Sequence, residues 1–273
     1  MYHCARLEPN PLRLRLNSLA RSSALVALVV LLGGCASVSA ITDLFSQGAQ
    51  LMPPASDLYA QGETDLGSKR YQDARLAFRK IVERYPQTTY APRARFLIGE
   101  AYYREGEWDK AIKEFESFLA FYPRHQIADL VQYRLAMAYY DQMKPVEQDQ
   151  AITARAMAAF KTLVREYPDS RYASDALGKI DICRGRLAQK ELWVATYYIN
   201  QANPGAALQR LEGVLRDYPR TLVIPETLFR LGEVNAALGR RQEAHEAFQK
   251  VASEYSYTEW GRRAAQRLRT ATR

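Results

Sequence analysis

ARLAFRKIVERYP, residues 74–86, is the segment that decides the fold. Its apolar residues recur every three or four positions, which places them along one face of an α-helix. They are Ala74, Ala77, Phe78, Ile81, Val82 and Tyr85. Lys80, Glu83 and Arg84 fall outside this stripe, and Pro86 cannot continue a helix. The segment therefore predicts an amphipathic helix that ends at a Tyr-Pro pair.

The pattern returns four more times along the chain. The anchoring tyrosines are Tyr85, Tyr122, Tyr167, Tyr218 and Tyr255, with Ser in place of Pro after the last, at spacings of 37, 45, 51 and 37 residues. A small residue precedes each anchor at a constant distance, at Ala74, Ala111, Ala156, Ala207 and Ala244. Four residues later comes a large apolar one, Phe78, Phe115, Phe160, Leu211 or Phe248. A second small residue lies further upstream, at Gly62, Gly99, Ala136, Ala195 and Gly232.

This arrangement resembles the tetratricopeptide repeat, in which small residues let two helices approach closely and an aromatic fills the groove. We predict an all-α, tetratricopeptide-like superhelical solenoid of five helical hairpins over residues 57–273. The N-terminal repeats cover 57–173 and the C-terminal repeats 174–273. No run of residues alternates between apolar and polar, so no sheet is expected.

Two of the spacings are longer than 37 residues. The extra residues in the third copy are polar, at 142–150, and predict a surface loop between its paired helices. Before the fourth copy, Ser174–Gln201 contains no proline and reads as one helix of roughly 40 Å. A helix that outruns its partner must bury its overhang against the preceding repeats or against another protein.

The N-terminus has the pattern of an export signal. Basic residues precede a short apolar run, Ala24–Leu32, which is too short to span a membrane. The run ends in Leu32-Gly33-Gly34-Cys35, which looks like a bacterial lipobox. We expect cleavage after Gly34 and acylation of Cys35 by S-diacylglycerol and an N-palmitoyl chain.

The alternative is an ordinary signal peptide that is cleaved after Ala40. Ala36, rather than Asp, follows the cysteine and favours the outer membrane, with the protein facing the periplasm. Residues 1–34 are thus predicted to be a lipoprotein signal and residues 35–56 a flexible tether.

Composition and motifs exclude several classes of function. Lys and Arg number 38 and Asp and Glu 30, but the signal carries 3 of the 8 net positive charges, so nucleic acid binding has little support. Three cysteines cannot build a disulfide scaffold, and no Cys/His spacing suggests zinc. Nucleotide-binding and hydrolase motifs are absent from the sequence. We therefore expect a binding protein without cofactors rather than an enzyme.

Two features have alternative interpretations. Tyrosine pairs lie on the predicted first helices, at Tyr102, Tyr103, Tyr139, Tyr140, Tyr197 and Tyr198. They either fill the core and its rim or form an aromatic platform for peptides. The basic C-terminal stretch around Arg262 and Arg263 either caps the solenoid or docks an acidic partner or lipid headgroup. Cys183 is expected to be a small core residue.

The segments 163–172 (LVREYPDSRY) and 208–219 (LQRLEGVLRDYP), together with the lipobox and five repeats, resemble the BamD family of outer membrane lipoproteins. The resemblance implies a scaffold of the β-barrel assembly machinery whose partners are a POTRA domain of BamA, unfolded outer membrane proteins and other assembly lipoproteins. It places a BamA contact at Arg210, to which we add Glu212, Arg216, Arg262 and Arg263. Substrate peptides are assigned to Tyr102, Tyr103, Tyr139 and Tyr140. The alternative is a repeat lipoprotein that serves cell-wall or envelope-division machinery.

Overall fold

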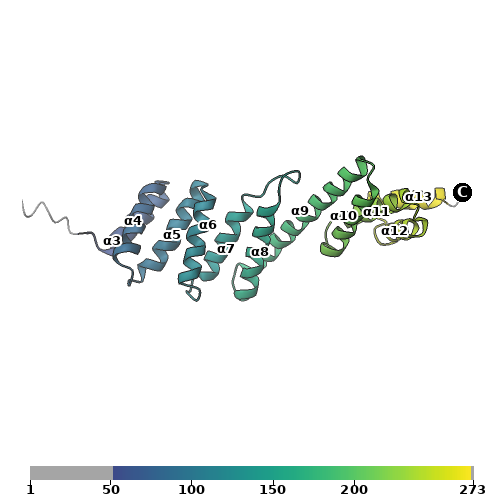
Figure 1. Cartoon of the computed structure of the whole chain (residues 1–273). Coiled ribbons are helices and arrows are strands. Elements are labelled where there is room, and N and C mark those ends of the chain that lie inside the picture. Colours follow the sequence, from purple (N-terminus) through teal and green to yellow (C-terminus); the bar gives the residue numbers. More distant parts are fainter. Residues whose placement is uncertain (1–51, 272–273) are drawn as a thin grey trace, which may run out of the picture. The chain divides into compact units, whose positions relative to one another are not determined.

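The computed structural model describes residues 52–271, and within that range all regular secondary structure is α-helical (Figure 1). The helices of the first three hairpins are α3 (Ala55–Gly67), α4 (Tyr71–Arg84), α5 (Tyr90–Glu105), α6 (Trp108–Phe121), α7 (Ala128–Tyr140) and α8 (Ala151–Glu166). They are followed by α9 (Ala173–Asn200), α10 (Pro204–Asp217), α11 (Ile224–Ala237), α12 (Arg241–Glu254) and α13 (Glu259–Ala271). The predicted signal, Cys35 and most of the predicted tether lie outside the described residues.

The helices pair as the repeats predict. Each first helix packs against its own second helix, and each second helix packs against the first helix of the next hairpin. After the fifth hairpin, α13 packs on α12 and α11 and covers the end of the stack. The predicted all-α tetratricopeptide-like fold of five hairpins is confirmed, with α13 as an additional closing helix.

Three glycines show why the small upstream residue is needed. A Cβ atom added to Gly62, Gly99 or Gly232 would lie only 2.5, 2.6 or 2.7 Å from the nearest ring atom of Phe78, Phe115 or Phe248, respectively. Such a separation is far inside van der Waals contact, so a side chain there would force the helices apart. The pairing of glycine with phenylalanine therefore sets how closely the two helices of a hairpin pack.

The anchoring tyrosines all end a second helix in the same conformation. Their φ angles lie between −126° and −132°, and each tyrosine N–H donates to the carbonyl four residues earlier. The chain then turns, because the Tyr85 carbonyl accepts the N–H (3.1 Å) and the hydroxyl (2.7 Å) of Thr88. Tyr255 binds Thr258 in the same way, at 2.9 and 2.7 Å, although Ser256 replaces proline. The turn thus depends on the tyrosine carbonyl as well as on proline.

The extra residues of the third copy form an ordered loop between α7 and α8. Gln150 is buried at the end of this loop, and its Nε2 donates to the Pro145 carbonyl at 2.7 Å. Its Oε1 accepts from the Thr153 hydroxyl, also at 2.7 Å. One buried amide therefore closes the loop and joins it to the first turn of α8.

The long helix α9 uses this loop to cover its overhang. Arg186 donates to the Lys144 carbonyl at 3.1 Å, and Lys190 to the Glu147 carbonyl at 2.9 Å. Cys183 is buried against the loop, as expected of a core residue, and burial raises the pKa of its thiol to about 11. The overhang thus packs on the preceding repeat, which is one of the two alternatives that the sequence left open.

Candidate partner-binding surfaces

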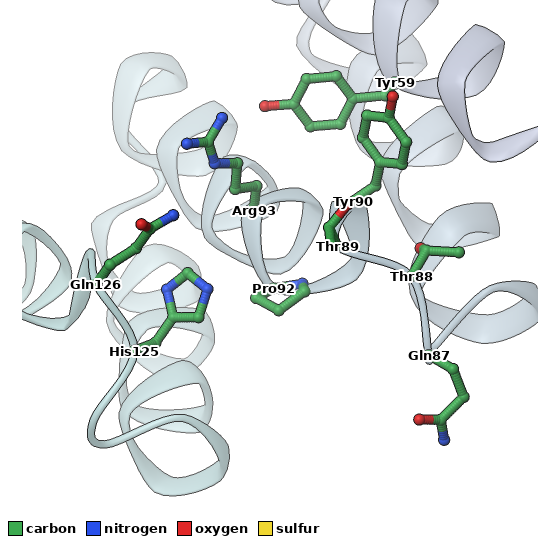
Figure 2. A pocket seen from close by; sticks show the side chains of 9 residues that line it. All are labelled: Tyr59, Gln87, Thr88, Thr89, Tyr90, Pro92, Arg93, His125 and Gln126. Atoms are coloured by element: carbon green, nitrogen blue, oxygen red, sulfur yellow. The ribbon is translucent and has the colours of Figure 1, made fainter.

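A hollow of about 530 Å³, lined by polar and aromatic side chains, lies between the turns that precede α5 and α7 (Figure 2). We call it the N-terminal hollow; its walls include Tyr59, Thr89, Tyr90, Arg93, His125 and Gln126. Figure 2 shows the Arg93 guanidinium between the Tyr59 hydroxyl and the Gln126 side chain. The residues come from three successive first helices and their turns, so stacking of the repeats creates the hollow.

The charge of this hollow comes from Arg93. Within residues 52–271, Arg93 forms no ion pair with a carboxylate. Burial, followed by the nearby Arg93 charge, lowers the pKa of His125. Burial, followed by Glu63, raises the pKa of Tyr59. The residues that line the hollow therefore offer one fixed positive charge, that of Arg93, at neutral pH, while the Glu63 carboxylate lies close to the Tyr59 hydroxyl at its edge. A guanidinium in this position can form paired hydrogen bonds with a carboxylate.

The tyrosines that were assigned to substrate are half-buried and tie neighbouring helices together. The Arg75 guanidinium lies 4.2 Å from the centroid of the Tyr102 ring, and Arg79 donates to the Tyr102 hydroxyl at 2.8 Å. The Tyr103 hydroxyl donates to Asp141, and burial, helped by Asp141, raises the pKa of Tyr103. Both rings thus contribute to packing between repeats.

The second pair has the same character. The Tyr139 hydroxyl donates to Glu116 at 3.1 Å, while the Lys179 ammonium lies 4.6 Å from the centroid of the Tyr140 ring. The four tyrosines pack on three separate core clusters rather than on one surface. Their role in peptide binding stays a prediction.

A buried carboxylate that the sequence did not single out lies beside these rings. The Glu100 side chain is 4% exposed and forms ion pairs with Arg104 at 2.9 Å and Arg134 at 3.1 Å. Arg134 belongs to α7, so this pair crosses from the second hairpin to the third. The sequence signal for a buried carboxylate was the position of Glu100 between Gly99 and Ala101 on a buried helix face. Its partner Arg134 could not be predicted, because the pair depends on how the hairpins stack.

The residues assigned to BamA do not form one cluster. Arg210 and Arg216 line a polar hollow of about 350 Å³ with Glu191, Asp217 and Tyr218, which we call the C-terminal hollow. The Arg210 guanidinium forms an ion pair with Glu191 at 3.0 Å, which fixes it against α9. Arg216 forms an ion pair with its neighbour Asp217 at 2.8 Å.

The other three residues lie on different surfaces. Glu212 lines a separate shallow hollow together with Arg240, Glu243 and Lys250. Arg262 is exposed on α13. The Arg263 guanidinium lies 4.7 Å from the ring centroids of both Phe229 and Trp260, so it helps to hold α13 on α11. The structure thus brings Arg210 and Arg216 together and leaves the other three apart.

Neither a membrane span nor a metal site is found between residues 52 and 271. None of the helices there has an apolar stretch long enough to cross a bilayer. No three His, Cys, Asp or Glu side chains in that part of the chain converge as metal ligands would.

These features define a helical-repeat protein with polar hollows among its N-terminal and its C-terminal hairpins. The family model YfiO, described as outer membrane lipoprotein, matches residues 52–270, and the chain belongs to this family. A relative in Caulobacter vibrioides, named outer membrane protein assembly factor BamD, is 32% identical over 70% of this chain and 63% of its own length. A relative of the same name in Rickettsia prowazekii is 28% identical over 87% of this chain and 92% of its own length.

Solved structures of repeat proteins align with lower similarity. A thermophilic tetratricopeptide repeat protein of Thermus thermophilus covers 78% of this chain and 98% of its own, with 19% identity and a TM-score of 0.35. The TPR2AB domain of yeast Sti1 covers 80% of this chain and 84% of its own, with 12% identity and a TM-score of 0.42.

Proposed function

We propose that this chain is an outer membrane protein assembly factor that acts as a non-catalytic scaffold. The observation that carries the proposal is the family match over residues 52–270, with relatives that bear this name. Stacked helical hairpins support it, because such repeats bind peptides or helices along their surfaces. Two of the ion pairs described above join different helices, Glu100 with Arg134 and Arg210 with Glu191, and so help to hold the stack together.

Cys35 is proposed to anchor the protein in the outer membrane, with residues 52–271 facing the periplasm. Two or more acyl chains give stable anchoring, whereas one gives only marginal binding. We expect Cys35→Ser to move the protein from the membrane fraction to the soluble periplasmic fraction. Retention of Cys35→Ser in washed membranes would contradict the anchor.

The C-terminal hollow is proposed to contact a periplasmic POTRA domain of a BamA-like barrel protein. Arg210 and Arg216 supply guanidinium groups that can form paired hydrogen bonds with a carboxylate of the partner. Glu191 holds Arg210 in place and pre-orders its side chain for this contact. Glu212, Arg262 and Arg263 lie on other surfaces. We therefore propose only Arg210 and Arg216 for the contact with the POTRA domain.

The N-terminal hollow is proposed to bind the carboxylate end of unfolded outer membrane proteins. Arg93 is its one fixed cation, and Thr89, Gln126 and Tyr90 can supply polar and aromatic contacts around it. We expect Arg93→Gln to weaken binding of a peptide with a free C-terminal carboxylate roughly tenfold, because a charge-assisted hydrogen bond is lost. An amidated version of the same peptide should bind both proteins equally. If the free and amidated peptides bound the unmodified chain equally, carboxylate recognition would be wrong.

Co-purification tests the scaffold directly. The lipidated protein is isolated from detergent-solubilised envelopes, and we expect to recover a large barrel protein with POTRA domains. Arg210→Ala should reduce this recovery at least tenfold, whereas the matched variant Arg165→Ala, which removes an exposed arginine of α8, should not. Recovery of soluble periplasmic proteins alone would sink the proposal.

A further inference from the structure

The shallow hollow beside Glu212, of about 310 Å³, is built by three successive helices, α10, α11 and α12. We call it the α11 hollow, because α11 supplies its central residues Leu228, Leu231 and Asn235. Glu212 of α10 lies on one side, and the residues of α12 and of the turn before it lie on the other. The residues on that second side are Arg240, Glu243, Glu246, Ala247 and Lys250.

One side chain of the α11 hollow has an unsatisfied hydrogen-bonding atom. Asn235 is only 5% exposed, and its Oδ1 has no hydrogen-bond donor among the described residues. The backbone carbonyl of Asn235 does have a donor, because it accepts the Arg240 N–H at 2.9 Å. A buried amide oxygen without a partner is unfavourable, and most such groups in proteins are satisfied. The α11 hollow therefore contains a buried acceptor that lacks a donor.

In the first two hairpins a hydrogen bond joins the positions that correspond to Glu212 and Asn235. These positions lie six residues before and 17 residues after the anchoring tyrosine. In the first hairpin Arg79 donates to the Tyr102 hydroxyl at 2.8 Å. In the second hairpin the Tyr139 hydroxyl donates to Glu116 at 3.1 Å. The two positions thus face each other across neighbouring helices.

In the fourth hairpin the two positions face each other without a hydrogen bond. Glu212 and Asn235 line the same hollow, but no hydrogen bond joins them in the part of the chain that the structure describes. The ionised Glu212 carboxylate only accepts, and the free Asn235 Oδ1 also accepts. The third hairpin has two basic residues there, Lys161 and Arg184, which cannot pair with each other either. A donor placed between Glu212 and Asn235 would satisfy both acceptors.

The carboxylates around the hollow favour a donor that carries a positive charge. Glu212, Glu243 and Glu246 are exposed, and none of them forms an ion pair within residues 52–271. Arg240 and Lys250 also line the hollow, but neither pairs with a carboxylate of that part of the chain. Lys250 lies roughly two helical turns from Glu243 along α12. The lining thus carries three carboxylates against two cations, and its carboxylates are available to a further cation.

We infer that the α11 hollow binds an arginine side chain of a partner protein. A guanidinium has five N–H donors, so it can donate to Asn235 Oδ1 and to the Glu212 carboxylate at the same time. The methylene stem of the arginine packs on Leu228 and Leu231. This inference goes beyond the proposed function, because the α11 hollow is separate from the N-terminal and C-terminal hollows and its argument uses only groups of this chain.

Titration with N-acetyl-arginine amide tests the inference. The full chain is isolated in detergent with labelled methyl groups, and the Leu228, Leu231 and Ala247 methyl signals report on the hollow in NMR spectra. We expect saturable shifts with a Kd in the millimolar range, as is typical of so small a ligand. N-acetyl-citrulline amide has nearly the same shape without the charge and should bind roughly tenfold more weakly.

Variants identify the groups that bind the arginine. Asn235→Leu removes the buried acceptor and should weaken binding roughly tenfold. Glu212→Gln removes an exposed carboxylate and should weaken binding about threefold, whereas Arg240→Gln removes a competing cation and should strengthen it by a similar factor. The matched control Glu254→Gln changes an exposed residue of α12 outside the hollow and should leave binding unchanged. Circular dichroism checks that each variant is folded.

Three results would each overturn the inference. The first is the absence of saturable shifts in these methyl signals up to about 100 mM of the arginine compound. The second is equal binding of the arginine and citrulline compounds. The third is unchanged binding of the arginine compound in Glu212→Gln together with a folded Asn235→Leu.

Discussion

The first and fifth hairpins are built on the same framework but differ in what covers it. Each has a glycine against a phenylalanine ring and a tyrosine that ends its second helix. The first hairpin is covered by Tyr102 and its turn contains proline, whereas the fifth has an open hollow and Ser256 in the turn. Residues inside the hairpins repeat because each hairpin must pack on its neighbours. The side chains around them differ because α5 packs on the first hairpin and α13 packs on the fifth.

The greatest loss of stability is expected inside the stack, away from both ends. Glu100→Ala should lower the free energy of unfolding by about 3–5 kcal/mol, because Arg134 would be left partly buried without its partner. Urea denaturation followed by circular dichroism measures this change. The control Glu107→Ala removes an exposed pair with Lys110 and should cost less than about 1 kcal/mol. Equal losses in the two variants would show that the Glu100 ion pairs do not stabilise the stack.

The glycine positions test the comparison of the two hairpins directly. Gly62→Ala should cost about 1–3 kcal/mol, because the new Cβ would meet the fully buried Phe78 ring. Gly232→Ala should cost less than half as much, because Phe248 lines an open hollow between α11, α12 and α13 into which its ring can shift. Thermal unfolding of both variants measures the difference.

Gly178 supplies the control for this pair. It lies in α9 with nothing within 4 Å of an added Cβ. Gly178→Ala should therefore stabilise the protein by roughly 0.5–1 kcal/mol through helix propensity alone. A larger loss for Gly232→Ala than for Gly62→Ala would contradict the difference in covering of the two rings.

A proline can make the fifth turn more like the first. Tyr255 already has nearly the backbone angles of the tyrosines that precede proline. Ser256→Pro should therefore stabilise the protein by about 0.4–1 kcal/mol, mainly by restricting the unfolded chain. Differential scanning calorimetry would show a rise in melting temperature, and a fall would mean that the turn conformations differ.

The smallest effect on stability is expected from a change of pH that protonates His125 in the N-terminal hollow. The folded state lowers the pKa of His125 below its ordinary value of 6.5, so the unfolded chain binds more protons between the two values. The contribution of neutral His125 to the free energy of unfolding is therefore complete above pH 6.5 and is lost as the pH falls. Because solvent screens this partly exposed ring, the loss should stay below about 1 kcal/mol. His125→Gln should flatten the dependence of stability on pH between 7 and 5, and an unchanged slope would contradict the assignment.

The sequence predicted the features that depend on local spacing. The five anchoring tyrosines and the glycine–phenylalanine pairs follow from periodicity within one hairpin, and the single long helix α9 follows from the absence of proline between Ser174 and Gln201. The Glu100–Arg134 and Arg210–Glu191 pairs could not be predicted, because each joins helices whose register depends on packing of one element on another. The N-terminal hollow and the hollow between α11, α12 and α13 were missed for the same reason, since three elements build each of them.

Depletion of the protein in its own cells tests the proposed assembly role most directly. The measurement is quantitative mass spectrometry of outer membranes as the protein is withdrawn, with the unmodified chain restored as a control. An assembly factor predicts that many β-barrel proteins fall together while other outer membrane lipoproteins are retained. Normal levels of barrel proteins, accompanied by a defect in cell shape or septation, would contradict the role.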